Sequence, residues 1–514
     1  MGLKSIKWDI TGNCNLRCIH CCTGDKYAQE KEKELSLEKR FKILDILAAG
    51  GVSSVNLLGG EPLTLGDDFF SIIEYGVSKG IHMSSNTNGL LLKSDVIKRL
   101  VEVGISSLTV SIEGSSSEAH DAVRGKGTFK KIIANVRNLT EYISKEETPM
   151  DVFVNTVLNK QNYSNIEEMV DLCLNLKVNK WSLLQLGFVG YAKDNVNNLA
   201  LTTEEIIDTA RRVAKRVDPD FNDLKGLVFE NRFTYSPVSS FITQQHGYKL
   251  PKPEVCCTGS LCFGFVDPYG NMFACERIPG NYIGYNINSA PITTMNLLDN
   301  DFYQIWNSGY FMEMFPLILD SSTYKNYEPC NHCKLLRIGE CTPCPLNSLK
   351  NEKVVIDDCL YIEQKLGDIN NFEEEIREEN LQHSEELKIK ENIQEHNDIK
   401  AFDLTTFEFE QYYPVRTDGI RSYEEKGRYT LFNPYTLETI ELNKIGTYVW
   451  DLIDGNTSIY RIIKSLTDET DLLPVSEELF REKANYFFYS LNKKQLIMLN
   501  DTKTTLKSPP VNAS

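Results

Sequence analysis

The cysteines of this 514-residue chain form three groups instead of being spread along the sequence. Four lie within positions 14–22, four within 256–275 and five within 330–359, and Cys173 stands apart. The polar N-terminal sequence MGLKSIKWDITGN has no secretory pattern. We therefore expect a reducing cytoplasm, where disulfides are rare, and clustered thiols in such a compartment indicate metal binding.

The spacing of the first cysteine group distinguishes between metals. Cys14, Cys18 and Cys21 form a CxxxCxxC motif with three thiolates, whereas a closed structural zinc site needs four ligands. Cys22 directly follows Cys21, so we expect it to point away from the same site. Three thiolates on a cubane iron–sulfur cluster leave one iron open to a small molecule. The spacing thus favours an open 4Fe–4S cluster, with zinc as the alternative.

The elements around this loop alternate between strand and helix patterns. We predict strands at 5–11, 52–60, 82–88, 106–114, 150–158 and 180–188, and helices at 36–48, 68–79, 94–103, 129–143, 164–176 and 203–216. Six such units predict an α/β fold, a partial (β/α)6 barrel that binds ligands at the carboxyl ends of its strands. The cysteine loop, Gly59–Gly60, Asn88–Gly89 and Glu113–Gly114 all fall at those ends.

Residues 1–220 resemble a radical SAM core domain. The motif CNLRCIHC (14–21) matches the cluster loop of that family, with His20 where an aromatic residue is more usual. GGEP (59–62) resembles the motif that binds the methionine part of S-adenosylmethionine (SAM). Gly59 and Gly60 let the backbone approach a ligand, and the resemblance implies that Glu61 accepts a hydrogen bond from the SAM ammonium.

Two further segments extend this resemblance. SIEG (111–114) is similar to the ribose-contacting segment, which implies Ser111 and Glu113 as ligands, although Asp is commoner there than Glu. HDAVRGKGTF (120–129) resembles the stretch whose arginine, here Arg124, pairs with the SAM carboxylate. Taken singly, GGEP could be a tight turn. Ser111 and Glu113 could be ordinary polar residues at a strand end, and Arg124 could form a surface ion pair. The order of the motifs and their place at strand ends favour a SAM site.

The later cysteines resemble the SPASM module, which carries auxiliary clusters. By motif position, one 4Fe–4S cluster would take Cys256, Cys262, Cys275 and Cys344, and the other would take Cys330, Cys333, Cys341 and Cys359. Cys257 could replace Cys256, and interleaved zinc knuckles are the alternative, with His332 as the nearby histidine. Glu276, directly after Cys275, is a candidate base or an ordinary surface acid. Cys173 is expected to be a buried core thiol.

The chain changes character after these cysteines. Residues 363–400 carry twelve acidic and five basic side chains, which is typical of a solvated helix or tether. Beyond them we predict a hairpin (427–434 and 436–443, turning at Asn433–Pro434), helices at 444–453, 456–469 and within 476–499, and a terminal strand. This region resembles the PqqD-like, winged-helix fold, which binds leader peptides as an added strand. A DNA-binding winged helix is the alternative, but a basic recognition surface is lacking.

These interpretations divide the chain into a radical SAM core (1–220), a SPASM domain with a bridging region (221–362), an acidic linker (363–400) and a PqqD-like domain (401–505). The formal charge of −17 argues against a nucleic-acid partner. We also find no run of 18 apolar residues, so we expect no membrane span.

The resemblance implies an enzyme with three 4Fe–4S clusters and SAM, which it cleaves reductively to a 5′-deoxyadenosyl radical. The substrate would be a ribosomally made precursor peptide, and the reductant a flavodoxin or ferredoxin in an anaerobic cytoplasm. The preferred product is a thioether crosslink. Carbon–carbon or carbon–oxygen crosslinking is the next alternative, and epimerisation comes after it. An anaerobic sulfatase-type protein maturase and a non-enzymatic iron–sulfur electron carrier are the rival classes.

Overall fold

The computed structural model forms two compact units, Leu3–Phe311 and Met312–Ser514 with Met1–Gly2, and each is described by itself. The structure describes residues 4–24, 27, 34–251, 263–276, 286–287, 290–291, 295–306, 328–337, 341, 357–366, 411–416, 420–425, 428–433, 438–442, 444–468, 484–485, 487–488, 491–492 and 496–500. We call the first unit the core unit and the second the C-terminal unit.

The core unit is built on one ten-stranded sheet of order β12-β9-β8-β1-β2-β3-β4-β5-β6-β7. Seven consecutive strands run parallel: β1 (Lys4–Thr11), β2 (Val52–Gly59), β3 (His82–Thr87), β4 (Ser107–Ser111), β5 (Asp151–Val157), β6 (Lys180–Leu184) and β7 (Val228–Arg232). On the other side of β1, β8 (Phe263–Val266) is parallel, and β9 (Asn271–Phe273) and β12 (Met295–Asn296) continue antiparallel. β10 (Asn286–Ile287) and β11 (Ala290–Pro291) form a separate pair.

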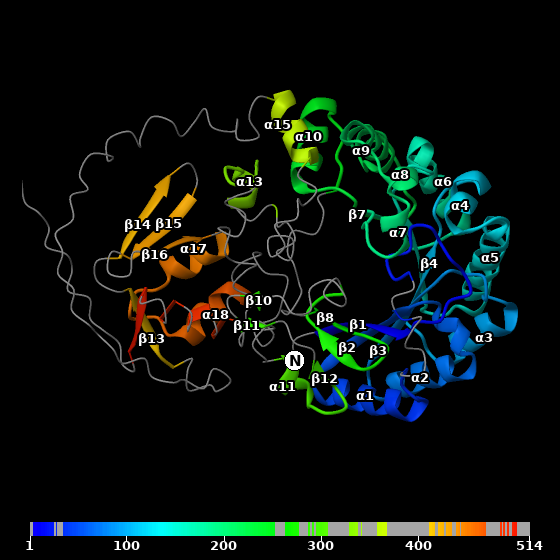
Figure 1. Cartoon of the computed structure of the whole chain (residues 1–514), viewed down its shortest axis with the longest axis horizontal. Coiled ribbons are helices and arrows are strands. Elements are labelled where there is room, and N and C mark those ends of the chain that lie inside the picture. The colour runs from blue at the N-terminus through cyan, green and yellow to red at the C-terminus, as the bar shows by residue number, and fades with distance from the viewer. Residues whose placement is uncertain are drawn as a thin grey trace, which may run out of the picture. The chain divides into compact units, whose positions relative to one another are not determined.

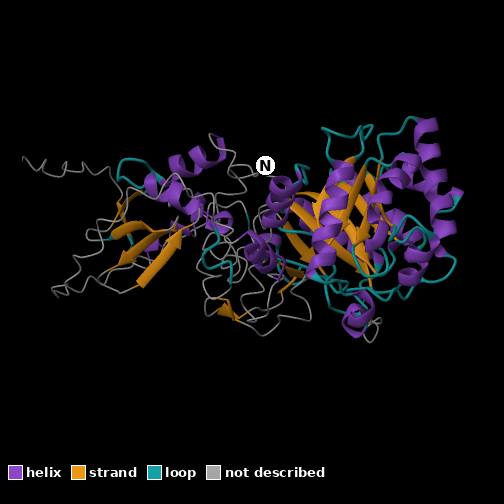
Figure 2. Cartoon of the chain, turned by 90° about the horizontal axis from the view of Figure 1, so that it is seen from above, coloured by secondary structure: helices purple, strands orange, loops and turns teal. Residues whose placement is uncertain are grey.

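The helices of the core unit connect its strands, and most of them cover one side of the sheet (Figures 1 and 2). They are α1 (Leu37–Ala49), α2 (Asp67–Ser78), α3 (Ser94–Glu102), α4 (Ser117–Arg124), α5 (Thr128–Glu146), α6 (Met169–Leu176), α7 (Tyr191–Asp194), α8 (Val196–Leu199), α9 (Thr203–Val217), α10 (Ser236–His246) and α11 (Phe302–Trp306), with 3-10 turns at Pro62–Leu65 and Tyr163–Glu168. Local signals explain several helix starts. The Ser36 side chain caps α1, and Thr202 and Glu205 form a capping box at α9.

The six predicted strands and the helices between them are confirmed to within a few residues. The sheet nevertheless has two more parallel strands than expected, β7 and β8. β7 has the sequence VFENR, and three polar residues in five leave little apolar pattern to find. This strand lies beyond residue 220, where we placed the end of the core domain, and β8 also shares the sheet. The division of the chain into domains stays a prediction.

The sheet has an apolar and a polar face at β4–β7. Val110, Val154, Trp181 and Phe229 lie side by side in register. Atoms of Val110 and of Ile132 on α5 lie within 3.1 Å of where a Cβ on Gly89 would be, so this row faces the helices. Ser111, Asn155, Ser182 and Glu230 form the next row. Because successive side chains alternate, that row lies on the opposite face, which we call the inner face.

The C-terminal unit contains two short helices near its cysteines, α13 (Lys334–Arg337) and α15 (Asp357–Leu366). Further along, β14 (Arg421–Glu425), β15 (Arg428–Asn433) and β16 (Glu438–Leu442) form an antiparallel sheet, and β13 (Tyr413–Arg416) pairs with β17 (Ile497–Asn500). Two helices, α17 (Lys444–Asp451) and α18 (Ile459–Asp468), follow the three-stranded sheet.

The predicted hairpin strands, both helices and the terminal strand are confirmed in this unit, whereas β13 and β14 were missed. Ser458 accepts a hydrogen bond from the Arg461 N–H at 3.4 Å, so it is the cap of α18. The turn after Asn433, and most of the helix predicted within 476–499, lie outside the described residues. So does nearly all of the acidic segment 363–400.

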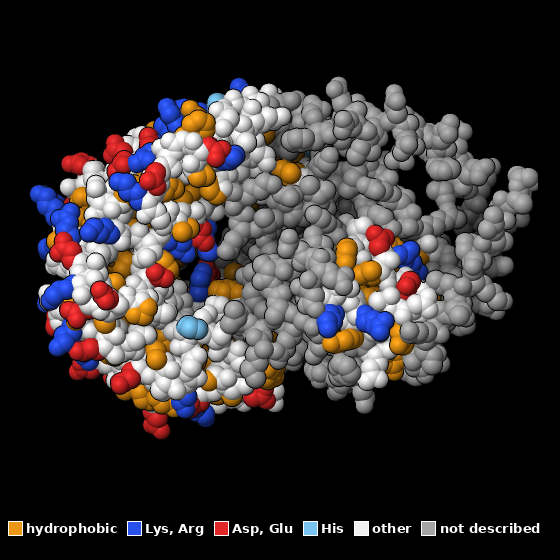
Figure 3. Space-filling view, turned by 180° about the vertical axis from the view of Figure 1, so that it is seen from behind, with side chains coloured by type: hydrophobic (Ala, Val, Ile, Leu, Met, Phe, Trp, Pro, Cys, Tyr) orange, Lys and Arg blue, Asp and Glu red, His pale blue; other side chains and the backbone are white. Residues whose placement is uncertain are grey.

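The surface of the core unit carries charges of both signs. Figure 3 shows Lys and Arg side chains mixed with Asp and Glu side chains over the visible face, without a large area of one sign. Among the described residues, no helix combines the length and the hydropathy that crossing a membrane requires.

The first prediction concerns Gly60, whose Cβ, if present, would lie 2.1 Å from the Asn13 carbonyl oxygen. We expect Gly60→Ala to lower the free energy of unfolding by about 1–3 kcal/mol, because the backbone must move to relieve the overlap. Thermal unfolding followed by circular dichroism measures this change. Gly187→Ala is the matched control, since no atom lies within 4 Å of its Cβ position. Equal stability of both variants would contradict the assigned contact.

Candidate active site

The cysteine loop begins where β1 ends, and a glutamate holds its first residues. Glu34 accepts a hydrogen bond from the Gly12 N–H at 2.7 Å and another from the Thr11 hydroxyl at 2.9 Å. The buried Arg40 guanidinium donates to the Ile10 carbonyl at 3.1 Å. The loop therefore leaves the sheet in a fixed direction.

The three thiols of this loop differ in exposure but share a type of contact. Cys14 is exposed, Cys21 half-buried and Cys18 buried. Each sulfur accepts an N–H: Cys14 from the Leu16 backbone at 3.5 Å, Cys21 from the Gly24 backbone at 3.3 Å, and Cys18 from the Arg124 guanidinium at 3.9 Å. Donors aimed at all three sulfurs fit thiolates that bind an iron–sulfur cluster.

Burial opposes ionisation of two of these thiols, Cys18 and Cys14, when no metal is bound. It raises the pKa of Cys18 to about 11, although the nearby Arg124 acts in the opposite direction. Burial also raises the pKa of Cys14. Thiolates in this loop therefore need a positive partner, and a bound metal centre provides one.

The GGE segment at the end of β2 lies directly against the cysteine loop. Gly60 donates its N–H to the Thr11 carbonyl at 2.8 Å, and Glu61 donates its N–H to the Asn13 carbonyl at 2.7 Å. Gly59 has a φ of 119°, which only glycine adopts easily. The glycines thus act here by close packing of backbone on backbone.

The Glu61 carboxylate points into the protein and is fully buried. It accepts hydrogen bonds from the Thr87 hydroxyl at 2.7 Å, the Asn88 N–H at 2.7 Å and the Leu63 N–H at 3.3 Å. The side chain therefore joins the ends of β2 and β3. Contact between Glu61 and a ligand ammonium stays a prediction, and the structure gives the carboxylate this internal role.

The carboxyl end of β3 contributes a contact that sequence reasoning missed. The Asn88 side chain donates to the Asn15 side-chain oxygen at 2.7 Å, which ties β3 to the cysteine loop. The signal was present, since Asn88 lies at a strand end and Asn15 lies inside the cysteine motif. No pattern in the sequence paired the two.

A second buried carboxylate, Glu113, follows β4. Its Oε1 accepts from Arg124 Nε at 2.9 Å and Nη2 at 2.6 Å, and lies 3.2 Å from His20 Nε2. Its Oε2 accepts the Val157 N–H at 2.8 Å. The structure therefore brings together Glu113 and Arg124, which we had assigned to the ribose and the carboxylate of SAM, with His20 of the cysteine loop. Ser111 lies half-buried on the inner face, and both ligand roles stay predictions.

The two buried glutamates respond differently to their surroundings. Burial raises the pKa of Glu61, because its donors are neutral and offset the loss of water only in part. Burial acts in the same direction on Glu113, but His20 and Arg124 outweigh it and hold the pKa of Glu113 well below its usual range. Glu113 is therefore an anion at neutral pH, matched to a guanidinium.

Distant segments also hold the cysteine loop. The Ile19 N–H donates to the Val123 carbonyl of α4 at 3.0 Å, and the Tyr191 N–H donates to the Cys21 carbonyl at 2.9 Å. A Cβ on Gly190 would lie 2.5 Å from the carbonyl oxygens of Cys21 and Cys22. Arg17 donates to the Tyr191 hydroxyl at 2.6 Å. Sequence reasoning did not find Gly190 or Tyr191, since about 170 residues separate them from the motif.

The candidate base Glu276 follows β9 and contacts β1. Its carboxylate is 2.7 Å from Lys7 Nζ and is about half exposed, at 44%. Cys275 beside it is half-buried. Three further predicted ligands, Cys256, Cys262 and Cys344, and the alternative Cys257, lie outside the described residues.

Four cysteines of the C-terminal unit gather at one place. Cys330 and Cys333 lie on one turn, where the Cys333 N–H donates to the Cys330 carbonyl at 3.3 Å. Cys341 donates its N–H to the Leu335 carbonyl at 3.0 Å, and Cys359 is on α15. Burial raises the pKa of Cys359 well above its usual value, and the charges of Cys341, Cys330 and Cys333 add to this effect. These are the four residues predicted to share one cluster.

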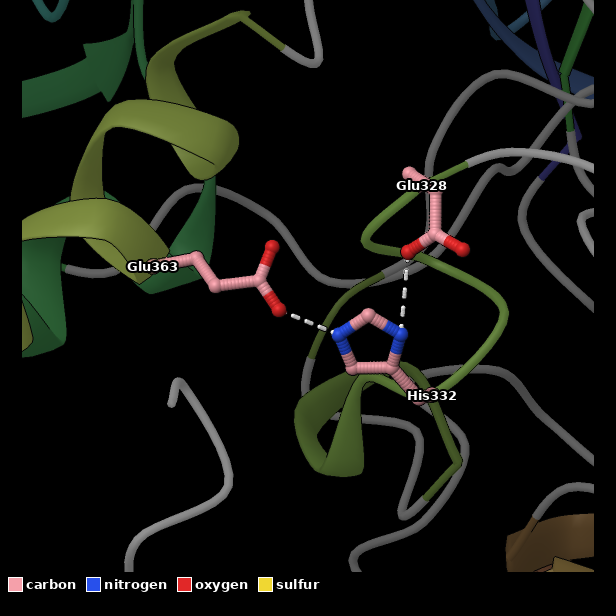
Figure 4. Close-up of side chains that lie close together, drawn as sticks. All are labelled: Glu328, His332 and Glu363. Atoms are coloured by element: carbon pink, nitrogen blue, oxygen red, sulfur yellow. Dashed lines mark hydrogen bonds and ion pairs between the residues drawn. The ribbon is translucent and has the colours of Figure 1, made fainter. Parts of the chain in front are cut away.

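His332 ties this turn to α15. Its Nδ1 lies 3.1 Å from the Glu328 carboxylate, and its Nε2 contacts the Glu363 carboxylate (Figure 4). The three side chains are close enough to be considered as a metal site. Each carboxylate, however, meets a different nitrogen of the ring (Figure 4), so the imidazole links the two carboxylates and holds α15, and hence Cys359, near Cys330 and Cys333.

Comparison with known protein families identifies both ends of the chain. The model of the Radical SAM superfamily matches residues 8–173, and the model of coenzyme PQQ synthesis protein D (PqqD) matches residues 428–497. The chain carries a radical SAM domain followed by a PqqD domain. It is therefore an enzyme whose radical SAM domain uses SAM and a 4Fe–4S cluster.

Two curated relatives that each cover about two thirds of this chain are named for different reactions. The AdoMet-dependent heme synthase of Methanosarcina barkeri is 27% identical over 348 residues, which are 66% of this chain and 90% of that protein. The mycofactocin maturase MftC of Mycolicibacterium smegmatis is 29% identical over 341 residues, which are 65% of this chain and 77% of that protein. The solved structure of native anSMEcpe with bound AdoMet and Cp18Cys peptide has a TM-score of 0.51 and 16% identity, and covers 71% of this chain and 96% of that one. This likeness supports the fold.

The second prediction uses His120, a fully buried residue of α4 whose Nδ1 accepts the Glu113 N–H at 3.0 Å. Burial and Arg124 lower the pKa of His120 from 6.5 to about 4. The unfolded chain then binds more protons between these values, so this contribution to stability is complete above pH 6.5 and is lost as the pH falls toward about 4. Over the whole window it amounts to roughly 3 kcal/mol.

His120→Asn keeps a hydrogen-bond acceptor but does not titrate. Between pH 7.5 and pH 5 we expect the wild type to lose roughly 2 kcal/mol more stability than this variant. Anaerobic urea unfolding at both pH values measures the difference. His82→Asn, at an exposed position on β3, is the control and should follow the wild type. Equal losses of unfolding free energy in the wild type and in His120→Asn would contradict the burial of a neutral imidazole.

Proposed function

We propose that this enzyme modifies a ribosomally made precursor peptide by radical chemistry started from SAM. The observation that carries the proposal is the presence of a PqqD domain on the same chain as a radical SAM domain. The mycofactocin maturase among the relatives supports a peptide substrate. The heme synthase is about equally similar over a similar length, and the PqqD domain favours the peptide substrate.

The cysteine loop would hold the cluster through Cys14, Cys18 and Cys21, with the Leu16, Gly24 and Arg124 donors on the three sulfurs. When cluster and SAM are bound, they supply a 5′-deoxyadenosyl radical that abstracts a hydrogen atom from the substrate. The chain's own groups would bind and orient the cofactor. Arg124 would approach the SAM carboxylate, and Ser111 on the inner face the ribose. Glu61 would act by holding the loop, since its carboxylate is enclosed.

Two auxiliary 4Fe–4S clusters of a SPASM module would complete the cofactor set. The gathering of Cys330, Cys333, Cys341 and Cys359 supports one of them. The other would take Cys275, with Cys256 or Cys257, Cys262 and Cys344. Buried thiols that raise one another's pKa need a strongly positive partner to ionise, which suits a metal cluster.

A thioether crosslink is the product that we propose first. Joining a peptide thiol to a carbon removes two hydrogen atoms from the peptide. One leaves as a hydrogen atom to the deoxyadenosyl radical, and the other as a proton and an electron. An electron acceptor is therefore required, and auxiliary clusters suit that role. Carbon–carbon or carbon–oxygen crosslinking also removes two hydrogen atoms and needs the same electron acceptor. Epimerisation removes none overall and needs a hydrogen-atom donor instead. Glu276 is our candidate to receive the proton.

The PqqD domain would bind the leader of the precursor. Within the described residues, β14 and β16 are the outer strands of its three-stranded sheet. An extended leader can add to such an edge through main-chain hydrogen bonds, and pockets for alternate side chains give specificity. We infer a winged-helix-like unit that delivers the core of the peptide to the radical site, with a flavodoxin or ferredoxin as electron donor.

The third prediction separates peptide maturation from the rival functions by removing residues 401–514. We expect the truncated chain to cleave SAM at the wild-type rate without a peptide, because every radical SAM motif is retained. It should lose at least tenfold in affinity for its precursor peptide, to be sought in the neighbouring reading frames, as measured by fluorescence anisotropy of the labelled leader. The full chain with a scrambled leader is the control. Unchanged precursor modification by the truncated chain would favour a sulfatase-type maturase, and porphyrin turnover would favour heme synthesis.

A further inference from the structure

The cysteine motif has a histidine where its family usually has an aromatic residue, and the ribose segment has Glu where Asp is commoner. The structure puts these two departures in contact, because His20 Nε2 lies 3.2 Å from Glu113 Oε1. We propose that His20 and Glu113 form a positioning pair for Arg124. The pair fixes the guanidinium beside Cys18, where its hydrogen bond to the sulfur raises the reduction potential of the cluster. This inference rests on Cys14, Cys18 and Cys21 being the cluster ligands.

Glu113 cannot change its orientation without breaking several contacts. Besides its bonds to Arg124 and Val157, its own N–H donates to His120 Nδ1 at 3.0 Å. Its carbonyl accepts from the Asn162 side chain at 2.7 Å. The side chain is fully buried. Because Glu113 is held through both its backbone and its side chain, its carboxylate keeps one position and fixes the guanidinium.

Arg124 divides its donors between two partners. Nε and Nη2 both donate to Glu113 Oε1, whereas Nη1 points to Cys18 at 3.9 Å. Only about 10% of the Arg124 side chain is exposed. Fixing two of the three nitrogens on Glu113 determines where the third one points, because the guanidinium is planar.

His20 completes the arrangement from the cysteine loop itself. The imidazole is buried, and Nδ1 has no hydrogen-bond partner among the described residues. The imidazole therefore contacts Glu113 through Nε2. Nε2 and Arg124 meet the same carboxylate oxygen, Oε1. An aromatic residue at this position would fill the space but would not donate to Glu113. His20 thus couples the loop between Cys18 and Cys21 to the ion pair.

Hydrogen bonds and positive charge at the sulfurs stabilise the more negative, reduced form of a cluster. A guanidinium at Cys18 therefore makes the cluster easier to reduce. If His20 acts through Arg124, removing either side chain should shift the potential in the same negative direction. Removing His20 when Arg124 is already absent should have no further effect.

The test is an EPR-monitored redox titration of the reconstituted full chain without SAM, on the signal that a Cys14→Ala, Cys18→Ala, Cys21→Ala triple variant lacks. Four proteins form a cycle: wild type, His20→Phe, Arg124→Met and the double variant. We expect negative shifts in both single variants and a double variant equal to Arg124→Met. His20→Gln, which can keep a donor near the Nε2 position, should restore the wild-type potential. His82→Phe, the same substitution at an exposed position, should leave the potential unchanged.

Additive shifts in the double variant, or an unchanged potential in Arg124→Met, would overturn the inference while leaving the proposed function intact. Absence of that signal in the wild type would instead overturn the proposed function. If His20→Phe fails to assemble a cluster, His20→Leu takes its place in the cycle, with the same expected negative shift and no further effect when Arg124→Met is already present.

Discussion

The contact between two stretches of backbone, the end of β2 and the start of the cysteine loop, sets the rest of the site. Gly60 and Glu61 donate their N–H groups to the Thr11 and Asn13 carbonyls at 2.8 and 2.7 Å. Glycine is required because a Cβ at either Gly59 or Gly60 would overlap these carbonyls. Since Cys14 directly follows Asn13, the first thiol is placed by the sheet itself, which gives a functional loop the precision of a strand.

Two enclosed carboxylates extend this rigidity to the neighbouring strands. Glu61 joins the ends of β2 and β3 through neutral donors, and Glu113 joins the end of β4 to β5, α4 and the loop through one guanidinium, one imidazole and one backbone N–H. A buried anion destabilises a fold unless it is paired. Both buried carboxyl groups therefore lie where the positions of the three thiols must be kept.

Much of the fold could be predicted from the sequence because strands and helices alternate with clear apolar periods, and because the cysteine, GGEP and SIEG segments follow one another at strand ends. What the sequence could not supply were partners distant along the chain. Nothing in the pattern joins Arg17 to Tyr191 or Asn15 to Asn88, since these partners come from strand–helix repeats that are far apart in the sequence. The same limit hid the ion pair of Glu113 and Arg124, which we had treated as two separate ligands. β7 was missed for a different reason, because its polar inner-face residues mask its strand pattern.

The central claim is that three thiols of one loop hold a cluster at which SAM is cleaved. The direct test measures iron and sulfide content and 5′-deoxyadenosine formation by anaerobically reconstituted, reduced protein, for the wild type and for a Cys14→Ala, Cys18→Ala, Cys21→Ala triple variant. The account predicts about twelve irons in the wild type and about eight in the variant, as for three clusters reduced to two, with loss of 5′-deoxyadenosine. Retained SAM cleavage in the triple variant would contradict it.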